Sequence, residues 1–261
     1  MEHFIWNIDP VLLSLGPITI HWYGAIFASS IFAGLYYMKW VYQQEKQNVE
    51  SLENLLAYVV IGIIVGARLG HCFFYYPDYY FSNPMKILAI WEGGLASHGG
   101  GLGAIIGTYF YSRKNPFSLI WLLDRLAIAT ALFGIFVRSA NFVNAEIIGK
   151  ATNVPWAVVF QRIDNVARHP AQLYEAIAYA IIFVSLTAIY KLTKAKSYQG
   201  MLLGIFLIMT FTARFIIEFF KQQQAAYTIE ISLNTGQMLS IPFFLVGVVL
   251  VLWSLKNKAT V

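Results

Sequence analysis

The sequence predicts an all-α integral membrane protein with about seven transmembrane helices, its N-terminus outside (periplasmic) and its C-terminus cytoplasmic. Three observations support this prediction. Of the 261 residues, 58% are hydrophobic and only 12% are charged, against about 25% charged residues in an ordinary soluble domain. Apolar runs of about the length that crosses a bilayer follow one another along the chain. The basic residues fall mainly in the connections between these runs.

The apolar runs leave little of the chain outside the membrane. A window of about 19 residues places probable spans near 18–41, 54–75, 95–111, 119–137, 171–190, 200–220 and 238–255. We therefore expect a single transmembrane domain over residues 1–261, with an outer-face loop at 138–170. The run at 95–111 is short and rich in glycine, which favours a tightly packed or broken helix beside a cavity.

The basic residues of the connections predict the orientation. One set of alternate connections carries Lys39, Lys46, Arg113, Lys114, Lys191, Lys194, Lys196, Lys256 and Lys258. The opposite connections include the longest loop but carry only Lys86, Lys150, Arg162, Arg168 and Lys221. Cytoplasmic loops carry an excess of lysine and arginine, so the first set lies inside the cell. The net charge of +5 thus reflects membrane topology, and we expect no nucleic-acid partner.

The cysteine content and the lack of repeats exclude several classes of protein. The single cysteine, Cys72, lies in an apolar run, so an intrachain disulfide and a thiolate metal cluster are both impossible. We predict neither a metal nor an organic cofactor. No internal repeat is visible, which disfavours a transporter built from repeated halves.

A histidine stands among glycines at the start of the third run. The segment WEGGLASHGGGLG, residues 91–103, surrounds His98 with six glycines. Without side chains, positions such as Gly99 and Gly100 let the backbone approach a ligand closely. Close helix packing in lipid is the alternative for the glycines. A histidine at membrane depth needs a partner, so His98 is a candidate functional group.

A second group of polar residues follows the fourth run. If the chain stays helical there, Arg138 and Asn141 share one face and present a guanidinium and an amide to an anionic headgroup. Guanidinium geometry matches phosphate bidentately. Glu146 either lines the same site or forms a structural ion pair with Arg138.

A third group lies inside the sixth run. Arg214 and Glu218 are four residues apart and share a helix face. Placing either charge in mid-membrane costs about 2.5 to 3.5 kcal/mol. The pair either neutralises itself, or Glu218 holds Arg214 toward a ligand anion. Tyr23, at the start of the first run, suits an aromatic belt at the membrane interface. Another polar group, His169, Gln172 and Glu175, either caps and anchors the fifth run or belongs to a site. Structural pairing is expected for Arg68 with His71 and for Asp124 with Arg125.

Four ordered motifs resemble a known family. They are HGGGLG from His98, RSANFVNAEIIG from Arg138, HPAQLYEA from His169 and RFIIEF from Arg214. With HWYG around Tyr23, they resemble bacterial prolipoprotein diacylglyceryl transferases over the whole chain. The resemblance implies that a diacylglyceryl group passes from phosphatidylglycerol to the lipobox cysteine thiol of a prolipoprotein. The reaction forms a thioether, releases glycerol phosphate and begins lipoprotein maturation.

The resemblance also implies a cellular location, partners and a set of site residues. It implies a multi-pass protein of the bacterial inner membrane whose active site faces the periplasm and whose partners are membrane lipid and prolipoprotein signal peptides. Two positions depart from the family, because Ala140 replaces a common glycine and Thr210 stands where some members have tyrosine. The expected catalytic residues are His98, Arg138, Arg214 and Tyr23, and the expected substrate contacts are Arg138, Asn141, Glu146, Gly149, Glu218, Gly99 and Gly100.

Each residue has an expected task in such a reaction. His98 is the expected base for the thiol, since histidine titrates near neutral pH. Arg138 and Arg214 are expected to stabilise the charge that grows on the phosphate oxygen. Asn141 and Tyr23 are expected to bind headgroup or glyceryl oxygens. Glu146 and Glu218 are expected to orient the arginines.

A different class of function stays open at this stage. A transporter or channel for a small anion would line its path with Arg68, Arg138 and Arg214. Membrane enzymes that use metals or activated nucleotides usually need Asp-rich or Walker-type motifs, which are missing here.

Overall fold

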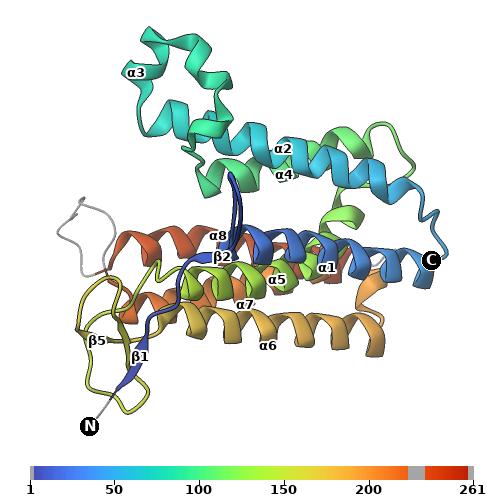
Figure 1. Ribbon diagram of the computed structural model, residues 1–261. Coiled ribbons are helices and arrows are strands. Elements are labelled where there is room, and N and C mark those ends of the chain that lie inside the picture. Colours follow the sequence, from blue (N-terminus) through green and yellow to red (C-terminus); the bar gives the residue numbers. More distant parts are fainter. Residues whose placement is uncertain (1–2, 223–232, 258–261) are drawn as a thin grey trace. The chain divides into compact units, whose positions relative to one another are not determined.

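The computed structural model describes residues 3–222 and 233–257 and is mostly helical (Figure 1). Lys258, one of the basic residues assigned to the cytoplasm, lies outside this range. The chain divides into two compact units, which we treat separately. The first combines residues 1–37 with residues 124–261, and the second covers residues 38–123.

The first unit is built mainly from helices α1, α5, α6, α7 and α8. Within it, α5 to α8 run alongside one another (Figure 1). Both α1 and α5 extend into the second unit at one end. Short 3₁₀ turns, η3 and η4, flank α7. The bounds are Trp22–Gln44 for α1, Leu119–Val143 for α5, Ala171–Leu192 for α6, Ala195–Ser197 for η3, Met201–Ile217 for α7, Glu218–Phe220 for η4 and Thr235–Lys256 for α8.

Sequence chemistry explains where two of these helices begin. Asn234 caps α8 with a capping box, in which its side chain accepts from the Gln237 backbone while the Gln237 side chain accepts from the Asn234 backbone. At α7, the buried Asp124 carboxylate accepts hydrogen bonds from the backbone N–H groups of Gly200, at 2.7 Å, and Leu203, at 2.8 Å. A carboxylate at a helix N-terminus accepts hydrogen bonds from backbone N–H groups that have no partner within the helix, and its negative charge is stabilised by the positive end of the helix dipole.

The first unit also contains short strands that hydropathy did not predict. A three-stranded sheet has the order β1-β4-β5, with β1 and β4 parallel and β4 and β5 antiparallel. Phe142 and Phe160 pack with Trp6 in a small apolar core beside it. A second, antiparallel pair joins β2 to β3. The strands are Phe4–Trp6 (β1), Val11–Leu15 (β2), Ile18–His21 (β3), Val158–Phe160 (β4) and Ala167–Arg168 (β5).

The second unit is organised by glycines on two facing helices, α2 (Ser51–Phe74) and α4 (Ser97–Ser112). A Cβ added to Gly103 would lie 1.9 Å from the Gly62 carbonyl oxygen, and one added to Gly99 would lie 2.2 Å from that of Gly66. The two backbones are therefore in direct contact. Three short helical segments connect the helices: α3 (Pro77–Ser82), η1 (Pro84–Leu88) and η2 (Ile90–Glu92).

The predicted spans need two corrections. The run at 18–41 begins with strand β3, so its helix starts at Trp22. The loop expected at 138–170 begins later, because α5 continues to Val143. Among the described residues, five helices are long and apolar enough to cross a membrane: Ser51–Phe74, Leu119–Val143, Ala171–Leu192, Met201–Phe220 and Thr235–Lys256. The count of seven spans, the orientation and the single domain stay predictions.

Candidate functional site

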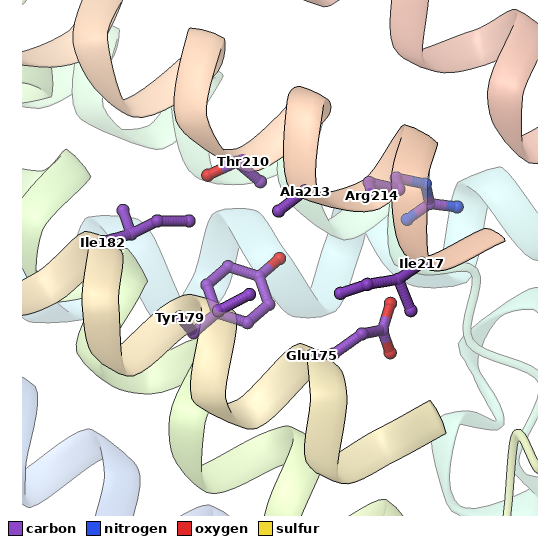
Figure 2. Close-up of a pocket in the computed structure, with 8 residues that line it drawn as sticks. Glu175, Tyr179, Ile182, Thr210, Ala213, Arg214 and Ile217 are labelled. Atoms are coloured by element: carbon purple, nitrogen blue, oxygen red, sulfur yellow. The ribbon is translucent and has the colours of Figure 1, made fainter. Parts of the chain in front are cut away.

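Polar side chains from α6 and α7 line a pocket within the first unit (Figure 2). Glu175 and Tyr179 reach it from α6, and Thr210 and Arg214 reach it from α7. The remaining lining is apolar, from Ala178, Ile182, Ala213 and Ile217. The spacing explains the arrangement, since residues four apart fall on one face of a helix.

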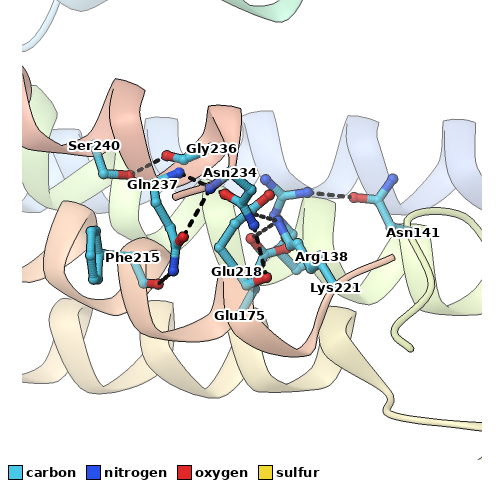
Figure 3. Close-up of polar contacts among 10 residues, drawn as sticks. All are labelled: Arg138, Asn141, Glu175, Phe215, Glu218, Lys221, Asn234, Gly236, Gln237 and Ser240. Carbon is cyan, nitrogen blue, oxygen red and sulfur yellow. Dashed lines mark hydrogen bonds and ion pairs between the residues drawn. The ribbon is translucent and has the colours of Figure 1, made fainter. Parts of the chain in front are cut away.

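Glu175 joins this pocket to Arg138 on α5. Its Oε2 atom lies 3.0 Å from Arg138 Nε, and its Oε1 atom lies 2.7 Å from Lys221 Nζ (Figure 3). The Glu175 side chain is 5% exposed and that of Lys221 is 8% exposed. Lys221 also lies 3.6 Å from Glu218 Oε2. One buried carboxylate therefore holds two cations that come from different elements.

Arg214 differs from the other cations of this cluster. In the part of the chain that the structure describes, it forms no ion pair, although it lines the pocket with Glu175. The predicted pairing of Arg214 with Glu218 is wrong, because Glu218 is paired with Lys221. A partly buried guanidinium without a carboxylate partner favours an anion in the pocket beside it.

The helix that carries Arg138 brings it together with Asn141. Because α5 stays helical to Val143, both residues share a face, as predicted, and Arg138 Nη1 donates to Asn141 Oδ1 at 3.3 Å. The Asn141 amide in turn donates to Glu146 Oε2 at 2.9 Å. The alternative of a direct ion pair between Arg138 and Glu146 is wrong, because Asn141 lies between them and Arg138 pairs with Glu175. The charges of Glu146 and Arg138 act on the Tyr23 hydroxyl, so α1 places this phenol near the same cluster.

The loop after α5 has a constrained backbone. Ala145 and Ile147 have φ values of 56° and 54°, which is unusual for side chains with a Cβ and most of all for a β-branched one. Such conformations cost about 1 to 3 kcal/mol each and persist where surrounding contacts impose them. Here the Gln172 side chain donates to the Glu146 carbonyl, and Asn144 donates to the Glu146 carboxylate at 3.0 Å.

Gly149 and Ala140 have packing explanations. A Cβ on Gly149 would lie 2.3 Å from the His169 carbonyl oxygen and 2.8 Å from that of Phe220, so only glycine fits this junction. Ala140 is fully buried within α5. Its methyl group is accommodated by a regular helix, so the departure from the family's glycine leaves the backbone of Arg138 and Asn141 helical.

His98 belongs to the second unit, where it is exposed at the second position of α4. Gly99 beside it does not open the backbone to a ligand, because it packs against Gly66. Gly100 is buried, and a Cβ there would make an ordinary contact with Ala67 at 3.5 Å. The alternative of close helix packing is therefore confirmed for Gly99.

Arg68 has a structural part in the second unit. It is 3% exposed and donates to the carbonyl oxygens of Ile87 at 2.9 Å and Gly93 at 2.5 Å. Its guanidinium also lies 5.1 Å from the centre of the Tyr80 ring. The expected pairing with His71 is wrong, because backbone carbonyls take up the donors of Arg68. Arg68 thus fixes the segment that leads into α4.

Sequence reasoning missed two members of the cluster, Glu175 and Lys221. Glu175 was interpreted as a residue that caps the fifth span, and Lys221 as a loop residue. A carboxylate one turn inside an apolar run was a usable signal, because a charge there needs a partner. For Lys221 the usable signal was its spacing from Glu218, three residues earlier.

Taken together, these features define a multi-pass helical membrane protein with a partly buried cationic centre at the ends of its helices. A family model described as prolipoprotein diacylglyceryl transferase matches residues 10–253. Proteins named phosphatidylglycerol–prolipoprotein diacylglyceryl transferase from Tolumonas auensis and Chloroherpeton thalassium are 52% and 47% identical to the chain. These matches cover 97% and 98% of this chain and 98% and 96% of the relatives. The chain belongs to the prolipoprotein diacylglyceryl transferase family.

Proposed function

We propose that the protein transfers the diacylglyceryl group of phosphatidylglycerol to the lipobox cysteine of a prolipoprotein, the first step of lipoprotein maturation. The relatives carry the name of this activity. The structural observation that supports it best is Arg214, which lines a pocket beside Arg138 and has no carboxylate partner among the described residues. Two guanidinium groups at one site suit a phosphate diester.

The reaction exchanges a C–O bond for a C–S bond. The cysteine thiolate attacks the glyceryl carbon that bears the phosphate, and the bonding electrons leave with the phosphate oxygen as glycerol phosphate. An ordinary cysteine has a pKa of about 8.5, so only about 3% is thiolate at pH 7 and ionising it costs about 2 kcal/mol. We assign removal of the thiol proton to His98, in line with the family resemblance.

Stabilisation of the leaving phosphate belongs to the cationic cluster. Negative charge develops on the phosphate oxygen as the C–O bond breaks, and fixed cations beside it need no reorganisation. Arg138 and Arg214 supply these charges. Glu175 fixes the Nε edge of Arg138 and leaves most of its other donors for the ligand. Asn141 and Tyr23 offer hydrogen bonds to the headgroup or glyceryl oxygens.

The placement of basic residues predicts the orientation of the protein in the membrane. The excess of lysine and arginine on alternate connections favours a periplasmic N-terminus and a cytoplasmic C-terminus, with seven spans in a bacterial inner membrane. Arg138 and Arg214 then lie toward the periplasmic face. Both substrates are amphiphiles, so we expect the site to open into the lipid as well as toward the periplasm.

A reconstituted assay tests the proposal. Purified protein in detergent is incubated with phosphatidylglycerol and a lipobox peptide, and the mass gain on cysteine and the release of glycerol phosphate are measured. We expect product with wild type, a loss of at least about a hundredfold in Arg138→Ala and Arg214→Lys, and no loss in the exposed loop variant Arg162→Ala. Folded wild type that makes no product but conducts anions in liposomes would contradict the proposal and favour a channel.

A further inference from the structure

Tyr179 is a polar side chain of the pocket that the mechanism above does not use. It projects from α6 between Glu175 and Ile182, and its hydroxyl points toward α7 (Figure 2). The charges of Arg138, Arg214 and Glu175 all act on this hydroxyl. The phenol therefore stands among the three charged groups of the centre.

A glycine on α5 keeps the Tyr179 ring in place. A Cβ added to Gly134 would lie 2.7 Å from two ring atoms of Tyr179, so the ring packs directly on the helix backbone. Gly134 is one turn before Arg138 on α5. The same helix thus provides both the surface that supports the ring and the guanidinium that the hydroxyl faces.

The chemistry of the neighbouring groups leaves the phenol proton available. A guanidinium has only donors, so the Tyr179 oxygen can only accept from a nearby arginine and keeps its own proton to donate. The nearest carboxylate, Glu175, already contacts Arg138 at 3.0 Å and Lys221 at 2.7 Å. Across the pocket, Thr210 is 8% exposed, and its Oγ1 atom has no hydrogen-bond partner among the described residues. A buried hydroxyl group without a partner, beside the phenol of Tyr179, indicates a polar ligand between α6 and α7.

We infer that Tyr179 is a substrate-contacting residue whose hydroxyl donates a hydrogen bond to a phosphate oxygen of the phosphatidylglycerol headgroup. The inference rests on the proposed function and assigns to this pocket the phosphate end of the lipid. Arg214 supplies the charge, Tyr179 supplies a directed donor, and the ring contact with Gly134 fixes that donor before the lipid arrives. A hydrogen-bond donor that is already in position stabilises the transition state more than a mobile one, because it does not have to reorient during the reaction.

The test removes only the hydroxyl. Tyr179→Phe keeps the ring on Gly134, and we expect kcat/KM for phosphatidylglycerol to fall about tenfold to hundredfold while KM for the lipobox peptide is unchanged. Inhibition by free glycerol phosphate should weaken by a similar factor. Tyr37→Phe is the matched control, because it removes another helix phenol that is bonded to Thr187 at 3.1 Å. This control should keep wild-type kinetics.

Several outcomes would overturn the inference. They are wild-type kinetics in Tyr179→Phe, a loss confined to the peptide KM, an equal loss in Tyr37→Phe, and unchanged inhibition by glycerol phosphate. A second readout needs no turnover, because phosphatidylglycerol that binds the native protein raises its melting temperature. We expect that rise, relative to phosphatidylcholine, to be smaller in Tyr179→Phe. An equal rise in Tyr179→Phe and wild type would contradict the inference, whether or not wild type made product. A wild type that bound phosphatidylglycerol but made no product would count against the proposed function alone.

Discussion

Glu175 is the residue on which the charge balance of the cluster depends. Replacing it with glutamine leaves Arg138 and Lys221 without their shared carboxylate, and breaking a buried ion pair from one side costs about 3 to 5 kcal/mol. Because the Arg138 side chain is 17% exposed, we expect the loss of stability in Glu175→Gln to be about 3 kcal/mol or less. Glu175→Gln should therefore lower the melting temperature and reduce transfer activity, measured by thermal unfolding in detergent and by the peptide assay.

A double variant separates lost charge balance from lost packing in this cluster. Lys221→Met removes one of the two cations that Glu175 holds, so Glu175→Gln with Lys221→Met buries one fewer unpaired charge. We expect the double variant to be more stable than the sum of the two single effects. Strict additivity would mean that the two side chains do not interact.

Asp164 allows a pH prediction outside the membrane spans. Hydrogen bonds from the Arg168 side chain, followed by one from the Val166 backbone, hold the pKa of its carboxyl below the usual value. A carboxyl whose pKa is lower in the folded state adds stability above its unfolded pKa of about 3.9. That contribution disappears as the pH falls through the lower, folded pKa. Asp164→Asn should thus lower the melting temperature at pH 7, with a difference from wild type that vanishes at acid pH.

At the level of single residues, sequence reasoning found the charges but not all of their partners. Arg138 and Asn141 come together as expected, because helical spacing places them on one face. The partner of Arg138 was wrong, since Glu175 is distant in the chain and only the packing of α6 against α5 and α7 brings it near. Such contacts leave no periodic signal in a single sequence.

At the level of elements, the glycines between α2 and α4 allow a direct test of close helix packing. Gly103→Ala would put a methyl group 1.9 Å from the Gly62 carbonyl oxygen, so the helices must separate. Overpacking of this kind typically costs about 1 to 3 kcal/mol. We expect a lower melting temperature for Gly103→Ala, measured in detergent.

Gly101 on the same helix is the control for this variant. Beyond the helix's own backbone, no described atom lies within 4 Å of a Cβ added there, and alanine is the better helix former by about 1 kcal/mol. Gly101→Ala should thus match or exceed wild-type stability. If both variants behaved alike, helix propensity and not contact would explain the glycines.

The helices were more predictable than the strands for a physical reason. Spans of twenty apolar residues produce a strong average in any window, whereas β1, β4 and β5 are three residues long or shorter. They form where segments distant in sequence meet, with Phe4 to Trp6 beside Val158 to Phe160. Strand β3 is apolar like helix α1, which follows it directly, so the hydropathy window assigned both to one span at 18–41.

At the level of the whole molecule, composition and charge placement identified a membrane protein, and motif order identified the family. In residues 3–222 and 233–257, five helices meet the length and hydropathy expected of spans. Helix α4 has only 16 residues, which at 1.5 Å per residue is about 24 Å, less than the bilayer core of about 30 Å. The count of seven thus depends on how a short, glycine-rich helix sits in the membrane, which hydropathy does not decide.

The orientation can be tested directly with single cysteines. The native Cys72 is buried, and its replacement by alanine gives a background without thiols. Cysteines are then placed at two exposed positions, Lys114 and Asn153. The excess of basic residues predicts that position 114 is cytoplasmic and position 153 periplasmic. In intact cells a membrane-impermeant maleimide should label only position 153, and permeabilised cells should label both. Labelling of position 114 alone in intact cells would reverse the orientation and place the cationic centre on the cytoplasmic side, away from the periplasmic face where we expect transfer to take place.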